Sequence, residues 1–150
     1  MKIKELSTDD VKAYRDTLMK LMHLCYEATC PGLADDAFCG EKVDGLYQYL
    51  KDGKANLFGA VDGDRLVGFH WCYEYSFLSQ RRYHSAYAAV LPEAAGRGIF
   101  SALYAAAEDK ARELGIHVIE LSVGQMNQKV IDIHKSHGYE IERVIMKKLV

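Results

Sequence analysis

The chain has 150 residues, a formal net charge of −2 at pH 7 and 49% hydrophobic residues. This length supports one domain with a hydrophobic core, and the near-neutral charge argues against a nucleic-acid-binding protein. No apolar run is long enough to span a membrane, and the N-terminus lacks the apolar segment of a signal peptide, so we expect a cytoplasmic protein. Its four cysteines match no zinc spacing, and we expect reduced thiols and no metal site.

The N-terminal third predicts one strand and two helices. Residues 2–6 alternate weakly as a short strand, and Ser7 can cap a long amphipathic helix that continues to about Cys25. A Pro-Gly pair ends that helix, and a second helix is predicted over about 35–51. The irregular segment 30–40 could be a mobile loop over a site or a plain connector.

Three antiparallel strands are predicted next. Residues 56–61 and 66–75 flank an Asp-Gly pair, which is typical of a β-hairpin, and a polar turn leads to a third strand at 83–90. Side chains alternate along a strand, so five residues of the second strand share one face, which we interpret as core rather than substrate pocket: Val67, Phe69, Trp71, Tyr73 and Tyr75.

The stretch VLPEAAGRGIF, residues 90–100, stands between the third of these strands and a strong helix over 101–114. A strand, a glycine loop and a helix N-terminus in this order form an anion site, because the first N–H groups of a helix lack intrahelical acceptors. Gly96 and Gly98 let the main chain approach a ligand, and Arg97 adds a positive charge. An ordinary strand-to-helix turn would explain the glycines about equally well.

The C-terminal third predicts two more strands around a short helix. The crossover helix leads to a strand at 116–123, which is therefore expected to run parallel to the strand before it. Asn127 can cap a short helix that ends near Gly138, and residues 139–150 predict a final strand. The predicted fold is an α/β domain whose central mixed sheet has about six strands flanked by about four helices.

The order of these elements resembles the GNAT family of acetyl-CoA-dependent N-acetyltransferases over essentially the whole chain, so residues 1–150 form a single domain of this kind. Residues 90–99 resemble the family's pyrophosphate loop, Gln/Arg-x-x-Gly-x-Gly/Ala. Residues 127–139 resemble the segment that lines the thioester end, Asn-x-x-Ala-x-x-x-Tyr-x-x-x-Gly-Phe. Together, in the right order and at the right separation, the two segments are far more specific than either alone.

The loop departs from the family pattern in two places. Ala95 replaces the usual Gln or Arg, and Phe100 replaces the second Gly or Ala, so backbone amides must do most of the phosphate binding. The resemblance implies that acetyl-CoA is the co-substrate, with no metal. The implied CoA-binding residues are Val90, Leu91, Ala95, Gly96, Arg97, Gly98, Ile99, Phe100, Ser101, Asn127 and His134.

The resemblance implies direct transfer, in which an amine attacks the acetyl carbonyl of the thioester while a base removes the amine proton. His84 is our first choice for the base, because a neutral imidazole suits proton removal near pH 7. Glu74 on the neighbouring strand is the second choice, and Glu120 is a third candidate that would need burial to raise its pKa. His134 stands where many members have a general-acid Tyr, and it could serve that role or simply pack in its helix.

These features predict an N-acetyltransferase acting on a primary amine of a small molecule, an amino sugar or a peptide. The alternative is a non-catalytic acyl-CoA-binding or interaction module with the same fold. Only about a dozen residues follow Gly138, where many members have a two-stranded hairpin. The last strand could be missing or supplied by a partner, so a homodimer through the C-terminal strand is expected.

Overall fold

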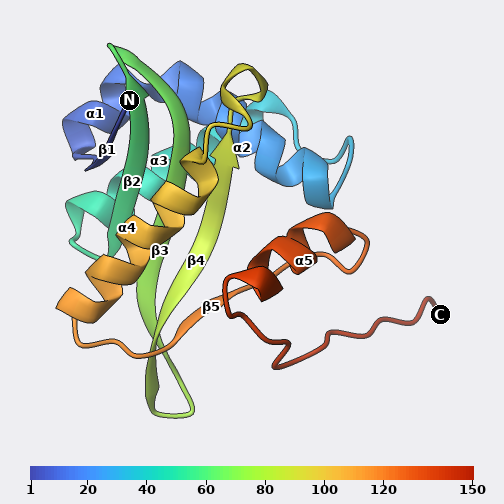
Figure 1. Ribbon diagram of the computed structural model, residues 1–150. Helices are drawn as coiled ribbons and strands as arrows, with labels where there is room; N and C mark the ends of the chain where they lie inside the picture. The colour runs from blue at the N-terminus through green and yellow to red at the C-terminus, as the bar shows by residue number, and fades with distance from the viewer.

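The computed structural model describes residues 1–150 and contains one five-stranded mixed sheet with helices on both faces (Figure 1). The strands lie in the order β1 (Lys2–Glu5), β2 (Ala55–Asp62), β3 (Arg65–Phe77), β4 (Gln80–Val90) and β5 (Ile119–Leu121). Neighbouring strands are antiparallel from β1 to β4, whereas β4 and β5 are parallel. The predicted mixed sheet is confirmed, with five strands instead of about six.

Five α-helices and one 3₁₀ turn surround the sheet. Their bounds are α1 Thr8–Ala13, α2 Arg15–Thr29, α3 Asp36–Lys51, η1 Pro92–Ala94, α4 Ile99–Glu113 and α5 Gln128–Ser136. Ser7 caps α1 as predicted, since its hydroxyl accepts from the Asp10 N–H and the Asp10 carboxylate accepts from the Ser7 N–H. The single long helix predicted after Ser7 is two helices, because the backbone leaves helical geometry at Tyr14 (φ −101°, ψ 16°).

Each face of the sheet has its own hydrophobic core. Helices α1, α2 and α3 pack on one face around Leu21, Leu46 and Phe69, and α4 packs on the other around Leu103 and its neighbours (Figure 1). Complete burial of side chains of this size stabilises the fold by about 2 kcal/mol each. The two cores fix the position of β3 and β4 from both sides, and β4 carries the residues of the candidate site.

Two bulges interrupt the antiparallel ladder. Ala60 pairs with Gly68 and Val61 with Leu66, so Val67 is the extra residue on β3. Val67 packs in the α4 core, so the prediction that it shares a face with Phe69 was wrong.

The second bulge lies on β4. Trp71 of β3 pairs with Tyr87 of β4, and Cys72 pairs with Ser85, which leaves Ala86 unpaired. A bulge of this kind adds one residue to one strand and bends it locally. The bend therefore lies in the middle of the strand that leads into the glycine loop.

Strand β5 is shorter than the strand predicted over 116–123. It has three residues and pairs only with Tyr83, His84 and Ser85 of β4. The edge of β4 from Ala86 to Val90 consequently has no strand partner on the β5 side. This unpaired edge begins at the bulge and ends at the glycine loop.

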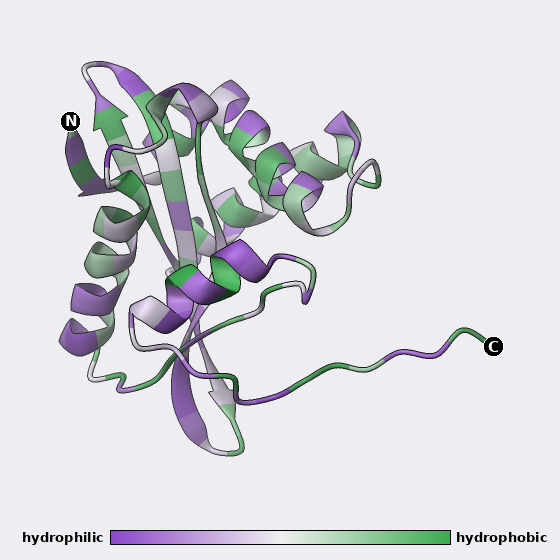
Figure 2. Ribbon diagram, turned by 45° about the vertical axis from the view of Figure 1, so that its right-hand side comes forward, coloured by the Kyte–Doolittle hydropathy of each residue, from purple (hydrophilic) through white to green (hydrophobic).

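The strand predicted over 139–150 was wrong, because these residues form an extended tail that leaves the body of the protein (Figures 1 and 2). Ion pairs from Arg82 to Glu142 and from Glu120 to Arg143 hold its first part beside β4 and β5. The remainder has alternating apolar residues but lies beside no strand edge, and a strand needs a neighbour to satisfy its backbone groups. None of the helices is long and apolar enough to cross a membrane.

Candidate active site

The glycine loop turns β4 into α4 through two glycines with left-handed backbone geometry. Gly96 has φ +76° and Gly98 has φ +72°, and a Cβ atom added at either would meet nothing within 4 Å. Glycine takes this conformation without strain, and the open space lets a ligand approach the main chain. The first helical bond of α4 runs from the Ala102 N–H to the Gly98 carbonyl at 3.1 Å, so three preceding N–H groups face outward without intrahelical acceptors. This is the geometry of an anion site.

Arg97 is turned away from this row of amides. Its Nη1 donates to Asp62 Oδ2 at 2.8 Å, at the turn between β2 and β3, and the guanidinium holds the pKa of Asp62 below its usual value. The N-terminal ammonium lies 3.7 Å from the other oxygen of Asp62. The ion pair therefore fixes the loop against the β2–β3 turn, and the backbone amides of α4 remain as the anion-binding groups.

The unpaired edge of β4 presents backbone groups between the bulge and the loop. Leu91 is buried and its N–H donates to the Val67 carbonyl at 2.8 Å, so its backbone faces β3. Backbone groups alternate in direction along a strand, so those of Val90 and Ala88 face the open edge. The Ala88 carbonyl accepts from the Cys25 thiol, which agrees with this direction. Val90 can thus bind a ligand through its main chain, whereas Leu91 contributes packing.

His84 lies just below the bulge, with one ring nitrogen held by a carboxylate. Its Nδ1 is 3.3 Å from Glu120 Oε1, and the ring contacts Tyr73 and Tyr75 at centroid distances of 5.0 and 5.7 Å. Burial lowers the pKa of His84, so the imidazole is neutral at neutral pH. With Nδ1 protonated toward Glu120, Nε2 carries the lone pair of a general base.

The carboxylate of Glu120 has three cationic or polar neighbours. Arg82 Nη1 lies 3.3 Å away and Arg143 Nη2 3.1 Å away, both on the oxygen that His84 does not contact. The two guanidinium groups hold the carboxylate in place, and the carboxylate in turn orients the imidazole. Glu120, the third candidate for the base, is therefore placed as the orienting partner of His84.

Glu74 lies on the opposite face of the sheet from His84. It stands opposite Tyr83, a residue of the α4 core, whereas His84 stands opposite Tyr73. Its carboxylate accepts two bonds from Arg81, at 2.6 and 3.2 Å, which keep its pKa below the usual value. The structure does not bring Glu74 and His84 together, and Glu74 serves as the partner of an exposed arginine.

His134 lies near the end of α5 and packs against α4. Its side chain is 6% exposed, and its ring contacts those of Phe100, Tyr104 and Tyr139 at 5.9, 5.2 and 5.2 Å. Burial and the neighbouring His137 lower the pKa of His134. At the start of α5, the Asn127 carbonyl accepts from two helical N–H groups, while its side chain makes no capping bond.

The same part of α4 holds the end of α5 through a polar contact as well. The Ser101 hydroxyl lies 3.5 Å from His137 Nε2. A small pocket between the two helices is lined mainly by aromatic and imidazole side chains: Phe100, Ser101, Tyr104, Glu108, His134, His137 and Tyr139. The predicted residues Phe100, Ser101 and His134 therefore come together, although they are far apart in the sequence.

A family model described as the acetyltransferase (GNAT) family matches residues 15–139. The chain belongs to this family. None of the curated proteins compared with it is similar in sequence. The resemblance to the GNAT family, seen in the glycine loop and in the segment from Asn127, is confirmed.

Three solved structures illustrate how closely the chain follows the GNAT fold. The aminoglycoside N-acetyltransferase AAC(6')-Iy in complex with CoA has a TM-score of 0.77 and 19% identity, over 99% of this chain and 93% of that one. An aminoglycoside acetyltransferase from an uncultured soil metagenomic sample, in complex with sisomicin, has a TM-score of 0.74 and 18% identity, over 99% of this chain and 95% of that one. A ribosomal-protein-alanine N-acetyltransferase from Brucella melitensis biovar Abortus 2308 has a TM-score of 0.70 and 19% identity, over 100% of both chains. At these identities the likeness shows a shared fold.

The site of this GNAT protein has the features that a pyrophosphate and a pantetheine chain require. The two glycines leave room for phosphate oxygens beside the outward N–H groups of α4. The open edge of β4 offers unpaired main-chain groups of the kind that bind amides. The residues present therefore fit acetyl-CoA, although Ala95 and Phe100 contribute no polar side-chain atom.

Sequence reasoning missed a buried polar cluster beneath α4. His70 is completely buried; its Nε2 lies 2.7 Å from Ser85 Oγ, and its Nδ1 lies 3.3 Å from the Leu103 carbonyl. The Ser85 hydroxyl lies 3.2 Å from the Tyr104 hydroxyl, and the Tyr104 ring stacks on His70 at 4.2 Å. Burial lowers the pKa of His70 to about 4, so it is neutral. The cluster joins the bulged strand to the helix of the glycine loop.

A cavity lies elsewhere, between the first half of α2 on one side and the β2–β3 turn and η1 on the other. It has a volume of about 630 Å³ and is lined by charges of both signs, including Lys20, His23 and Asp64. Arg65 and Glu93 pair across part of it at 3.3 Å. It contains neither His84 nor the amides at the start of α4.

Proposed function

We propose that this protein is an acetyl-CoA-dependent N-acetyltransferase that moves an acetyl group by direct transfer to a primary amine of a small molecule, an amino sugar or a peptide. The main support is the unpaired edge of β4, which has the outward amides of α4 at one end and His84 at the other. A chain bound along this edge would connect an anion site to a general base held by Glu120.

Each part of the site has one role in this proposal. Acetyl-CoA supplies the acetyl group as an activated thioester. The amides at the start of α4 bind its pyrophosphate, and the main chain at Val90 binds its pantetheine and polarises the acetyl carbonyl. His84 accepts the amine proton at Nε2 as the new N–C bond forms and the C–S bond breaks. In this proposal His134 gives a proton to the departing thiolate.

Binding of the co-substrate is tested by calorimetric titration with acetyl-CoA. Micromolar binding, roughly −8 kcal/mol, is expected for the wild type and none for Gly98→Glu, which puts a carboxylate among the amides. Gly53→Glu is the matched control, because Gly53 also has a left-handed backbone (φ +68°) and open space but lies after α3. Equal binding by the wild type and Gly98→Glu would contradict the proposed phosphate site.

Transfer itself separates the enzyme from a non-catalytic acyl-CoA-binding module. The module is favoured by one observation, the close packing of Phe100, Tyr104 and His134 between α4 and α5. An enzyme releases CoA thiol in proportion to added amine and loses this activity in His84→Ala. A module binds acetyl-CoA with the same affinity in both proteins and releases no thiol.

We also propose that two copies associate through the C-terminal tail and that the protein acts in the cytoplasm. The tail carries exposed apolar residues such as Val144, Ile145 and Leu149, and β5 is an edge strand with a free side. All four cysteines are free thiols, which supports a reducing compartment. Light scattering measures the oligomeric state, and a monomeric wild type would refute the dimer.

A further inference from the structure

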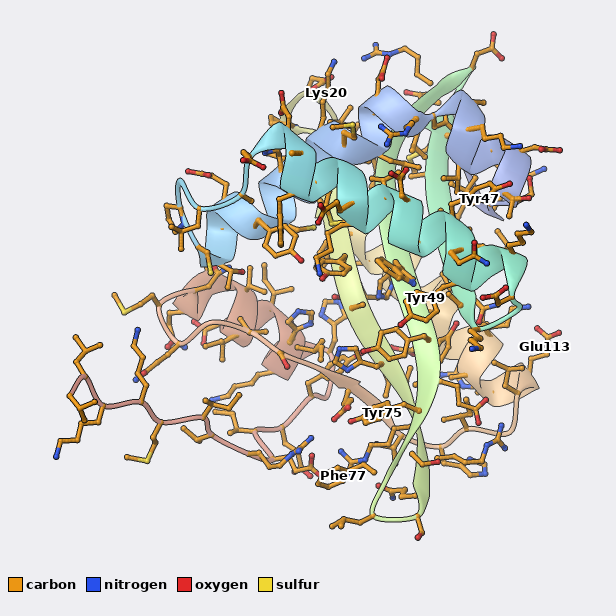
Figure 3. All side chains as sticks on the ribbon, turned by 180° about the vertical axis from the view of Figure 1, so that it is seen from behind. Lys20, Tyr47, Tyr49, Tyr75, Phe77 and Glu113 are labelled. Carbon is orange, nitrogen blue, oxygen red and sulfur yellow. The ribbon has the colours of Figure 1, made fainter.

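The surface beside His84 carries three tyrosines that we call the aromatic strip, namely Tyr49 of α3 and Tyr73 and Tyr75 of β3. Tyr49 stacks on Tyr73 with centroids 6.3 Å apart and an interplanar angle of 11°, and Tyr73 and Tyr75 are also 6.3 Å apart. Figure 3 shows Tyr49 and Tyr75 on the side of the sheet that α3 covers, between α3 and the β3–β4 hairpin. The strip leads directly to the His84 ring.

The aromatic strip lies at the margin of the core, where the Tyr49 ring contacts the Trp71 ring at 6.0 Å. Phe69 and Trp71, which precede it on the same face of β3, are buried in the core under α1, α2 and α3. Tyr73 and Tyr75 lie beyond that core and are half-buried, and Tyr49 is 47% exposed. None of the three hydroxyl groups forms a hydrogen bond within the protein. Partly exposed rings with free hydroxyls are typical of a binding surface, where the ring gives contact area and the hydroxyl a polar handle.

The carboxylates near His84 are already neutralised by arginines. Glu120 accepts from Arg82 and Arg143, and Glu142 accepts two bonds from Arg82 at 2.6 and 2.5 Å. A ligand with several ammonium groups needs free carboxylates to replace the water it loses. The surface around the proposed base offers rings instead, so it favours a ligand with one amine and a flat apolar body.

We propose that the acceptor is an arylalkylamine, a primary amine joined to an aromatic ring by a short alkyl chain. Its ring lies on the aromatic strip while its nitrogen reaches His84 Nε2. This inference rests on the proposed function, since the same step occurs. The nitrogen bonds to the acetyl carbon, the C–S bond breaks, the amine proton passes to His84, and the thiolate leaves and is protonated. The strip thus selects the acceptor through ring contacts, unlike a site for polycationic sugars.

Steady-state thiol release with acetyl-CoA and tyramine, 2-phenylethylamine or sisomicin tests this substrate class. The expected kcat/KM for the two aromatic amines exceeds that for sisomicin by at least about 100-fold. Tyr73→Leu is expected to reduce kcat/KM for tyramine by about 2- to 10-fold, mainly through KM, because an aromatic contact contributes about 0.5–1.5 kcal/mol. Its Kd for acetyl-CoA should not change. Tyr47→Leu is the matched control, because Tyr47 is another α3 tyrosine but lies against Lys12.

Direct binding separates failure of this inference from failure of the proposed function. Calorimetric titration of tyramine into the wild type and Tyr73→Leu measures ring binding without turnover, and weaker binding to the variant supports the strip. A protein that acetylates sisomicin as well as tyramine would overturn the inference and leave the N-acetyltransferase proposal standing. A protein that binds tyramine equally well with and without the Tyr73 ring would overturn it even if no amine is acetylated.

Discussion

The buried His70 makes a quantitative prediction about acid stability. The unfolded chain titrates this histidine near pH 6.5, whereas burial lowers the pKa in the folded protein to about 4. Between these values the unfolded state binds more protons, so the free energy of unfolding falls as the pH falls through this window. From the two pKa values, the loss due to His70 is about 2 kcal/mol between pH 7 and pH 5 and about 3 kcal/mol in full. The loss begins as the pH falls toward 6.5 and is negligible well above that value.

Urea unfolding of the wild type and of His70→Gln at pH 7 and pH 5 measures this loss. The neighbours Cys72 and Tyr104 stay neutral at both values, because burial raises the pKa of each group, that of Tyr104 to about 12. His70→Gln lowers stability at pH 7 through its altered hydrogen bonds, but its further loss on going to pH 5 should be smaller than that of the wild type by about 2 kcal/mol. The exposed His117→Gln should behave as the wild type. Equal pH dependence in the wild type and His70→Gln would refute the reasoning.

Three further predictions follow from other parts of the molecule. His84→Gln is expected to lower kcat by about 10²–10⁴-fold. Because burial lowers the pKa of His84, the wild-type rate should fall only below the ordinary imidazole pKa. A pH–rate profile of the variant should lack this fall at low pH. Ser7→Ala removes the cap of α1 and should cost about 1 kcal/mol by urea unfolding, and an unchanged midpoint would contradict the capping argument. Ile145→Asp, at a residue 94% exposed, should give a monomer by light scattering, whereas Lys147→Asp should leave a dimer; if Ile145→Asp leaves the dimer intact, the tail does not hold it.

Local signals in the sequence located most of the fold. The capping box at Ser7, the Asp-Gly turn after β2 and the glycine loop before α4 each act within a few residues, and each lies where predicted. The break at Tyr14 was not predictable from apolar spacing, because the hydrophobic period continues across it. The prediction of a final strand was wrong because the local pattern was present without the tertiary partner. Residues 139–150 have strand-like alternation but no neighbouring strand edge in the folded chain.

The candidate site was predictable to the extent that the relevant residues are local in sequence. His70 and Cys72 are two residues apart on β3 and so share a face, but no pattern in the sequence shows that Ser85 and Tyr104 meet them from β4 and α4. Glu74 and His84 were both reasonable bases by residue type, yet strand pairing puts them on opposite faces. The ion pair of Arg97 with Asp62 also depends on the tertiary fold, because it joins two turns that are distant in the sequence.

The extra residue at Ala86 changes which side chains can act together. Below the bulge His84 faces the helices α1–α3, and above it Tyr87 and Ala89 face the same way, although their numbers differ in parity from His84. Deletion of residue 86 would restore strict alternation, so one half of β4 would have to turn its side chains to the wrong layer. Homologous chains are therefore expected to align with this one without a gap between His84 and Leu91, even where every residue in the interval has been replaced.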